Sequence, residues 1–130
     1  MSVILSIKPK YCDEIRKGNK RYEFRKRNFT REVKYAFVYS TSPVKSIVGV
    51  LQIASVIEDD PKKLWEQCRN LSGVSKEEFF EYFRENEKGV AIKIDQAAMF
   101  DPIEPNQLFH DFCPPQSYTY VKTPFCMEQK

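Results

Sequence analysis

The chain has 130 residues, enough for one hydrophobic core and too few for two domains of ordinary size. Hydrophobic residues make up 42% of it and aromatic residues 14%, which is typical of a packed globular domain and argues against a disordered segment. No apolar run reaches the roughly 20 residues of a membrane-spanning helix, and the N-terminus lacks the basic region and cleavage site of a secretory signal, so we expect a cytoplasmic protein.

The net charge of +3 is unevenly distributed along the chain. The segment 17–31 carries seven basic residues and one acidic residue, a net charge of +6, which leaves −3 for the remainder. A basic segment of this kind is typical of a surface that meets phosphate groups. The alternative is a solvated basic hairpin without a ligand, and charge alone does not separate the two.

The predicted elements begin with a short apolar strand over 3–7. Pro9 suits the first position of the helix that follows over 10–17, and Gly18 supplies the left-handed residue that ends this helix. In chain order, the other expected elements are strands over 21–27, 34–40 and 46–57, helices that begin at 61 and after 75, a strand over 89–95 and a closing strand within 113–121.

Three local patterns refine this outline. In the strand over 21–27, Tyr22 and Phe24 are expected to face the core, while the other face carries ions: Arg21, Glu23, Arg25 and Arg27. Gly49 predicts a bulge or bend in the long strand. Asp59 or Asp60 is expected to cap the first central helix, whose apolar face is formed by Leu64, Trp65, Cys68 and Leu71.

The second central helix opens with a capping box, because Ser75 is followed three residues later by Glu78. Its aromatic residues are expected to be core: Phe79, Phe80, Tyr82 and Phe83. A loop is expected after Phe100. Strands dominate, so we predict an α+β fold consisting of a small mixed β-barrel, closed or nearly closed, with short flanking helices. One domain over 1–121 is expected, with a tail over 122–130, and nothing in the sequence demands more than a monomer.

The four cysteines include no C-x-x-C pair, and we expect them to be reduced thiols. His110, Cys113 and Cys126 offer three soft ligands near the C-terminus. A structural zinc site usually has four, so we expect neither a metal nor another cofactor.

Several motifs share the order of a known family. Leu5-Ser-Ile-Lys-Pro-Lys-Tyr11 is followed by Ile15, Gly18, Lys20 and Tyr22-Glu-Phe-Arg25. This series of helix, turn, charges and strand resembles ASCH domains, which are similar to the PUA RNA-binding fold, and the resemblance continues through 42–45, 47–49 and 114–118. It implies a PUA-like β-barrel with a cleft lined by such residues, and an RNA-linked role.

We therefore predict a basic cleft that binds RNA or a modified nucleoside, with no obligate protein partner. The candidate nucleic-acid-binding residues are Lys8, Tyr11, Lys20, Glu23, Arg25, Arg27, Gln116 and Tyr118. Arginine matches phosphate oxygens or a guanine edge, and lysine suits phosphate. Glu23 either orients Arg25 or accepts hydrogen bonds from a base amino group, and the tyrosines either stack on unpaired bases or pack in the core. The alternative for the whole set is a ladder of surface salt bridges.

Three functions remain open at this point: an RNA-binding module, a small hydrolase, and a protein-interaction adaptor linked to transcription. For a ribonuclease, Lys20 would stabilise developing charge, and Tyr22 or Glu23 would move a proton. The resemblance also implies amidohydrolase activity on an acylated cytidine, with a lysine base and a threonine nucleophile three residues later; Lys20 stands at the first position and Glu23 at the second. The lone histidine, His110, lies outside these motifs.

Overall fold

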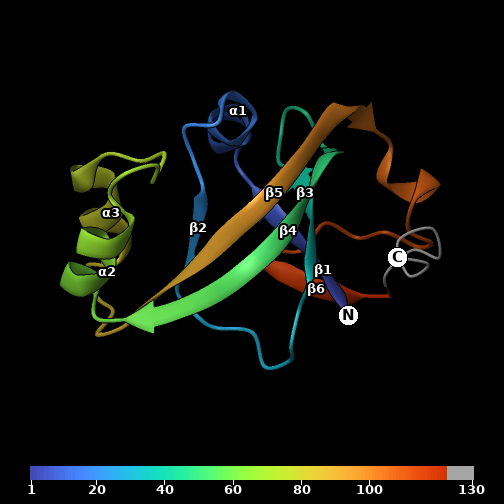
Figure 1. The fold of residues 1–130 in the computed structure, drawn as a ribbon. Coiled ribbons are helices and arrows are strands. Elements are labelled where there is room, and N and C mark those ends of the chain that lie inside the picture. The colour runs from blue at the N-terminus through green and yellow to red at the C-terminus, as the bar shows by residue number, and fades with distance from the viewer. Residues whose placement is uncertain (123–130) are drawn as a thin grey trace.

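The computed structural model describes residues 1–122 and has the predicted α+β architecture (Figure 1). Its strands are β1 (Ser2–Ile7), β2 (Tyr22–Arg25), β3 (Tyr35–Ser40), β4 (Ser46–Asp59), β5 (Gly89–Ile103) and β6 (Tyr118–Val121). Its helices are α1 (Pro9–Lys17), α2 (Pro61–Cys68), α3 (Lys76–Tyr82) and the 3-10 turn η1 (Pro105–Gln107). No helix within 1–122 is both long and apolar enough to cross a membrane.

The six strands form one sheet in the order β2-β5-β4-β3-β1-β6. β1 pairs with β3 in parallel, and the other strand pairs are antiparallel. The sheet curls into a half-barrel around β4 and β5, the two longest strands (Figure 1). The predicted closing strand is present as β6, which pairs with β1.

The curl is built by irregularities in β4 and β5. The register of their pairing shifts at three places, between Ile47 and Gly49 and at both sides of Ile53, and such bulges bend a strand and increase its twist. Gly49 lies at the first of these, as predicted. A Cβ there would collide with the sulfur of Met99 and approach the carbonyl oxygen of Ala98, so glycine allows β4 and β5 to approach each other closely at this point.

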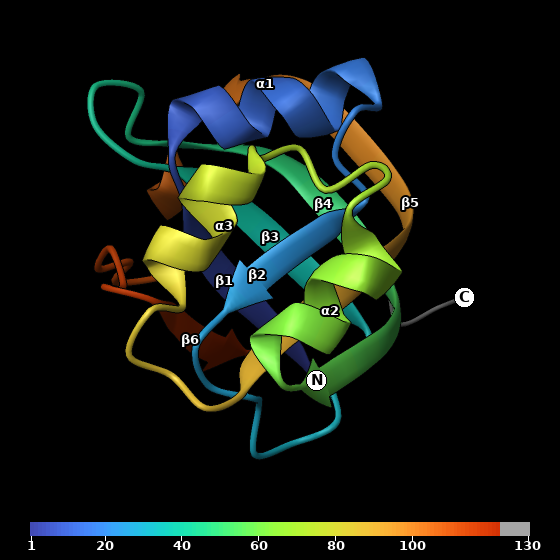
Figure 2. The same ribbon diagram turned by 90° about the vertical axis from the view of Figure 1, so that its left-hand side faces the viewer.

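The helices begin and end largely where the sequence predicts. Pro9 opens α1, and Gly18 ends it with a φ of 83°. The carboxylate of Asp60 accepts a hydrogen bond from the N–H of Lys62 at the start of α2. α2 and α3 lie next to each other on one side of the sheet, and α1 lies across one end (Figure 2).

Two predictions about the chain's course are wrong. The loop expected after Phe100 is the continuation of β5 to Ile103. Pro102 is accommodated because three residues of β5, 100–102, here lie opposite the single residue Val48 of β4. Proline is tolerated at such bulges, where a ladder hydrogen bond is already missing. Leu71, expected on the apolar face of the first central helix, lies beyond the end of α2 and is exposed.

The core has three parts. The largest lies inside the half-barrel, a second lies beneath α2 and α3, and a third lies on the opposite side of the sheet under residues near 100 and 109–112. The aromatic stripe of α3 contributes Phe79 and Phe83 to the second part, as predicted. Within 1–122 the cysteines are free thiols, and burial raises the pKa of Cys12 and Cys68 to about 11.

Candidate functional site

A cleft of about 280 Å³ opens between the two ends of the curled sheet. β2 and β1 provide its floor, α1 and α3 provide its walls, and Gln116 closes it from the segment before β6. The site is therefore assembled from parts of the chain that are far apart in sequence. Figure 2 shows the molecule from the side on which α3 and β2 lie.

Lys20 is buried at the base of this cleft, with 2% of its surface exposed. Its ammonium group donates to the carbonyl oxygen of Ser72 at 3.0 Å and lies 3.7 Å from Oε1 of Glu23. It also lies over the rings of Phe24 and Tyr11, at 4.8 and 5.4 Å from their centroids. Burial lowers the pKa of Lys20, and the charge of Glu23 opposes that shift. The cleft thus contains a partly desolvated amine.

Glu23 links Lys20 to Arg25. Its Oε2 accepts a hydrogen bond from Nη1 of Arg25 at 3.0 Å, and both side chains are buried, at 6% and 9% exposure. Of the strand face that the sequence assigns to ions, Glu23 and Arg25 line the cleft, whereas Arg21 and Arg27 are exposed outside its lining. Contact between a buried carboxylate and two buried cations offsets part of the cost of removing these groups from water.

Arg25 also connects the two ends of the sheet. Its Nη1 donates to the carbonyl oxygen of Ser6 in β1 at 3.3 Å, and its Nη2 donates to the hydroxyl of Ser117 just before β6. β2 and β6 are the two edge strands. The guanidinium thus joins β2 to the β1–β6 end of the sheet through side-chain hydrogen bonds, where the strands are not paired through their backbones.

Glu78 fastens α3 to α1 at the mouth of the cleft. Its Oε2 accepts from Nζ of Lys10 at 2.7 Å and from the hydroxyl of Tyr11 at 2.8 Å, while its Oε1 accepts from the N–H of Ser75. These donors, Lys10 first, lower the pKa of Glu78 to about 2. Burial and the hydrogen bond to Glu78 raise the pKa of Tyr11. The capping box is therefore also a contact between two walls of the cleft.

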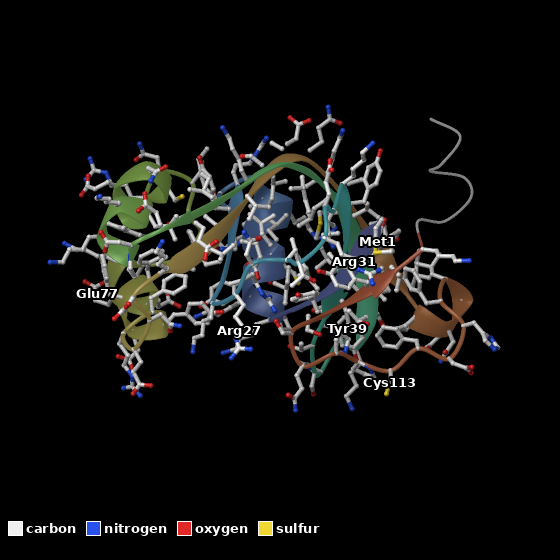
Figure 3. The ribbon with its side chains drawn as sticks, turned by 90° about the horizontal axis from the view of Figure 1, so that it is seen from below. Met1, Arg27, Arg31, Tyr39, Glu77 and Cys113 are labelled. Carbon is white, nitrogen blue, oxygen red and sulfur yellow. The ribbon has the colours of Figure 1, made fainter. Side chains whose placement is uncertain are left out.

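The structure brings most of the predicted site residues together. The cleft is lined by six of the eight: Lys8, Tyr11, Lys20, Glu23, Arg25 and Gln116. Two lie outside its lining. Arg27 is exposed beyond the end of β2, between Glu77 and Arg31 in the view of Figure 3. Tyr118 packs edge-on against Phe29, with ring centroids 5.0 Å apart.

Tyr22, a candidate proton carrier, also lies outside the cleft lining and packs with the cluster beneath α2 and α3. Two polar side chains of α3 that line the cleft, those of Glu78 and Tyr82, were not predicted as site residues. Ser117, which accepts a hydrogen bond from Arg25 and lies outside the lining, was not predicted either. Glu78 was assigned to capping and Tyr82 to the core. Both assignments follow from the spacing of residues within the helix. That spacing does not reveal that a capping or apolar residue can also line a cleft.

The three soft ligands near the C-terminus, from which no metal site was expected, are described only in part. Cys113 is exposed, and Figure 3 places it at the edge of the molecule. His110 is exposed too, with Nε2 at 3.2 Å from Asp111, and Cys126 lies outside the described residues. Within 1–122, no three His, Cys, Asp or Glu side chains are grouped so as to hold a metal ion.

The chain matches the family model of the ASCH domain over residues 5–98. An ASCH domain-containing ribonuclease of Zymomonas mobilis is 28% identical over 123 residues, which cover 92% of this chain and 83% of that protein. The crystal structure of ASCH from Zymomonas mobilis superposes with a TM-score of 0.86 at 25% identity and covers 98% of this chain and 92% of that one. A variant of that protein with a tyrosine changed to phenylalanine superposes with a TM-score of 0.86 at 24% identity, covering 98% and 95% of the two chains. The chain belongs to the ASCH domain family.

Proposed function

We propose that this protein binds single-stranded RNA and holds one unpaired nucleotide in the cleft. The observation that carries the proposal is the buried group of Lys20, Glu23 and Arg25 at the base of a cleft with aromatic walls. Folding such ions away from water is costly and is compensated here by their mutual contacts. A ligand that brings its own negative charge and polar edge would use the donors that remain.

Phosphate recognition is assigned to the two cations. An ammonium has three donors and a guanidinium has five, and the contacts described above occupy part of each set. Arg25 presents a rigid fork and Lys20 a compact charge, which are the two common ways of binding phosphate oxygens. Lys8, which also lines the cleft and is exposed, extends the positive charge toward solvent.

Base recognition is assigned to the walls. Tyr11 and Tyr82 line the cleft with aromatic rings on which a base can stack, and Gln116 offers an amide that can both donate and accept. The charged groups lie deep in a space of about 280 Å³, which suits one unpaired nucleotide. A paired base cannot reach them because it is held within its helix, so single strands, loops or free nucleosides are favoured. A modified nucleoside, such as an acylated cytidine, would use the same contacts.

RNA cleavage is the second candidate function, and the ribonuclease relative favours it. In the reaction we propose, a ribose 2′-oxygen bonds to the adjacent phosphorus while the bond from phosphorus to the 5′-oxygen breaks. Glu23 accepts the 2′-hydroxyl proton, and solvent returns a proton to the departing 5′-oxygen, leaving a 2′,3′-cyclic phosphate and a 5′-hydroxyl end. Lys20 and Arg25 stabilise the charge that develops on the phosphoryl oxygens.

The test combines binding with product analysis. Short RNAs, the matching DNAs and an N4-acylated cytidine are titrated at two salt concentrations against the unmodified protein and the Lys20→Met, Glu23→Gln and Arg25→Lys variants. RNA binding that weakens with salt and in Arg25→Lys supports the proposal. Cyclic-phosphate products that disappear in Glu23→Gln, with binding retained, establish cleavage.

Three other outcomes would change the assignment. Deacylation of the cytidine would make the protein an amidohydrolase. Equal binding of DNA and RNA would remove the assignment to RNA. Folded protein that binds none of these ligands would favour the protein-interaction adaptor, and circular dichroism of each variant separates that result from loss of folding.

A further inference from the structure

A second concavity lies between α2 and α3, on the other side of α3 from the cleft. It is an open groove of about 630 Å³. We call it the α2–α3 groove; it is lined by Lys62, Lys63, Trp65, Glu66, Arg69, Lys76 and Phe80. Nothing in the proposed function uses it.

Its aromatic residues form a partly exposed platform. Trp65 and Phe80 are half-buried, and their ring centroids are 6.2 Å apart. Trp65 is supported from below by Phe79, at 4.9 Å between centroids. A large ring fixed on one side and open on the other is what an unpaired base requires for stacking, whichever base it is.

The rim of the groove is positively charged. Lys62, Lys63, Arg69 and Lys76 are all exposed and surround one carboxylate, that of Glu66. None of these four cations forms an ion pair with another residue of 1–122. Their charge is therefore available to a polyanion, and an aromatic platform bordered by such cations is typical of single-strand nucleic-acid contacts.

We propose that the α2–α3 groove binds a second unpaired nucleotide of the strand that occupies the cleft, an inference that rests on the proposed function. α3 separates the two sites: Glu78 and Tyr82 line the cleft, and Lys76 and Phe80 line the groove. A helix is ~10–12 Å across, so a strand that crosses α3 reaches both. α2 and α3 lie on the same side of the molecule as β2 (Figure 2).

The experiment uses the single tryptophan of the chain as a local reporter. A uridine trinucleotide, short enough for the cleft alone, and a uridine dodecanucleotide are titrated while Trp65 fluorescence and total binding are recorded, since single-strand binders cover roughly 4–16 nucleotides. Gel electrophoresis afterwards establishes that the strands are intact. The groove variants are Lys62→Ala with Lys63→Ala, and Trp65→Phe. Arg25→Lys tests the cleft, and Lys88→Ala with Lys122→Ala is a control that removes equal charge elsewhere. Poly-glutamate is titrated as a polyanion without bases.

The dodecanucleotide is expected to quench Trp65 and the trinucleotide is not. Loss of both groove lysines should weaken dodecanucleotide binding by about fivefold or more and reduce its salt slope by about 1.4, at ~0.7 per phosphate contact, while the trinucleotide and the control variant are unaffected. Trp65→Phe keeps a ring under the groove and should retain folding and most of the binding.

The result that overturns the inference is tight, Arg25-dependent binding of both RNAs with no change in Trp65 fluorescence and no effect of the groove lysines. Equal quenching by poly-glutamate would assign the groove to acidic proteins and also overturn it. If the dodecanucleotide depends on the groove and Arg25→Lys has no effect, the groove is established and the cleft function fails. If neither RNA binds, both fail.

Discussion

Arg25 in β2 holds together two ends of the sheet through Ser6 and Ser117, and no backbone hydrogen bond joins β2 to β1 or β6 within 1–122. Glu23 of the same strand orients its guanidinium. Arg25→Ala should lower the free energy of unfolding by about 3 kcal/mol, because it leaves buried acceptors without a partner. Arg25→Lys keeps the charge but loses the fork, and about half that loss is expected. Urea unfolding measures both. Arg27→Ala, at an exposed position, should stay within about 0.5 kcal/mol of the parent; a similarly small effect of Arg25→Ala would show that the bridge is unimportant.

Glu78 makes stability depend on acid pH. Its folded pKa of about 2 lies below the ordinary value of 4.5, so its stabilising contribution is present above about pH 4.5 and is lost as the pH falls toward 2. Glu78→Gln should cost about 1 kcal/mol or less at pH 7, since the side chain is 40% exposed and its charge is screened by solvent. The difference in the free energy of unfolding between the parent and Glu78→Gln should vanish near pH 2.

Denaturant unfolding at several pH values between 2 and 7 tests this. Glu77→Gln is the matched control: Glu77 lies next to Glu78 in the first turn of α3 and is exposed. A constant difference between the parent and Glu78→Gln at every pH would mean that packing, and not charge, is responsible.

Single residues of the site were predictable to the extent that one short segment carries them. Glu23 and Arg25 follow from the alternation of the strand, and Lys20 follows from the resemblance to ASCH domains. The structure places all three in the cleft. The contribution of Glu78 was not predictable, because its contact with Tyr11 spans 67 positions of sequence. Periodicity reports which face of an element is apolar and says nothing about which other element faces it.

The connection between α2 and α3 positions Lys20. Lys20 forms an isolated bridge with Ser72, and the adjacent Gly73 has a φ of 71°. A Cβ at Gly73 would collide with the methylene groups of Lys20. Gly73→Ala should therefore cost about 2 kcal/mol or more, from left-handed strain and overpacking together, and should weaken RNA binding because Lys20 moves.

Gly18→Ala is the matched control for that prediction. Gly18 has a similar φ of 83°, and no atom lies within 4 Å of the position its Cβ would take. A loss of about 1 kcal/mol is expected from backbone strain alone, with unchanged RNA binding. Equal losses of stability and of binding in the two variants would contradict the assigned role of Gly73.

At the level of elements, the sequence predicts which helices and strands form better than it predicts where each one ends. The helix signals are local, so Pro9, Gly18 and the capping box of Ser75 all hold. The end of β5 was misplaced because Asp101-Pro102 has the composition of a turn. Whether such a pair ends a strand depends on the partner strand, and here β4 tolerates a bulge opposite it.

For the whole molecule, the order of the predicted elements indicates a closed or nearly closed sheet but not the order of its strands. The order β2-β5-β4-β3-β1-β6 leaves β2 and β6 as edges, and the cleft exists because these edges face each other with Arg25 between them. The basic segment 17–31 therefore separates into two parts. Lys20 and Arg25 are directed inward, and the other basic residues, among them Arg27 and Arg31, are exposed on the outside.

This division predicts how RNA affinity depends on salt. Each phosphate contact contributes about −0.7 to the slope of log affinity against log salt for a single strand. Arg27 is exposed just beyond the cleft residue Arg25, so a bound strand leaving the cleft should meet it. Arg27→Ala is expected to reduce the magnitude of the slope by about 0.7 for a long RNA and to leave it unchanged for a trinucleotide confined to the cleft. Fluorescence anisotropy across a salt series measures both slopes, with Lys88→Ala as the control of equal charge. A reduction of the same size in Lys88→Ala would assign the effect to net charge instead of to a contact, since long-range attraction depends on total charge and not on position.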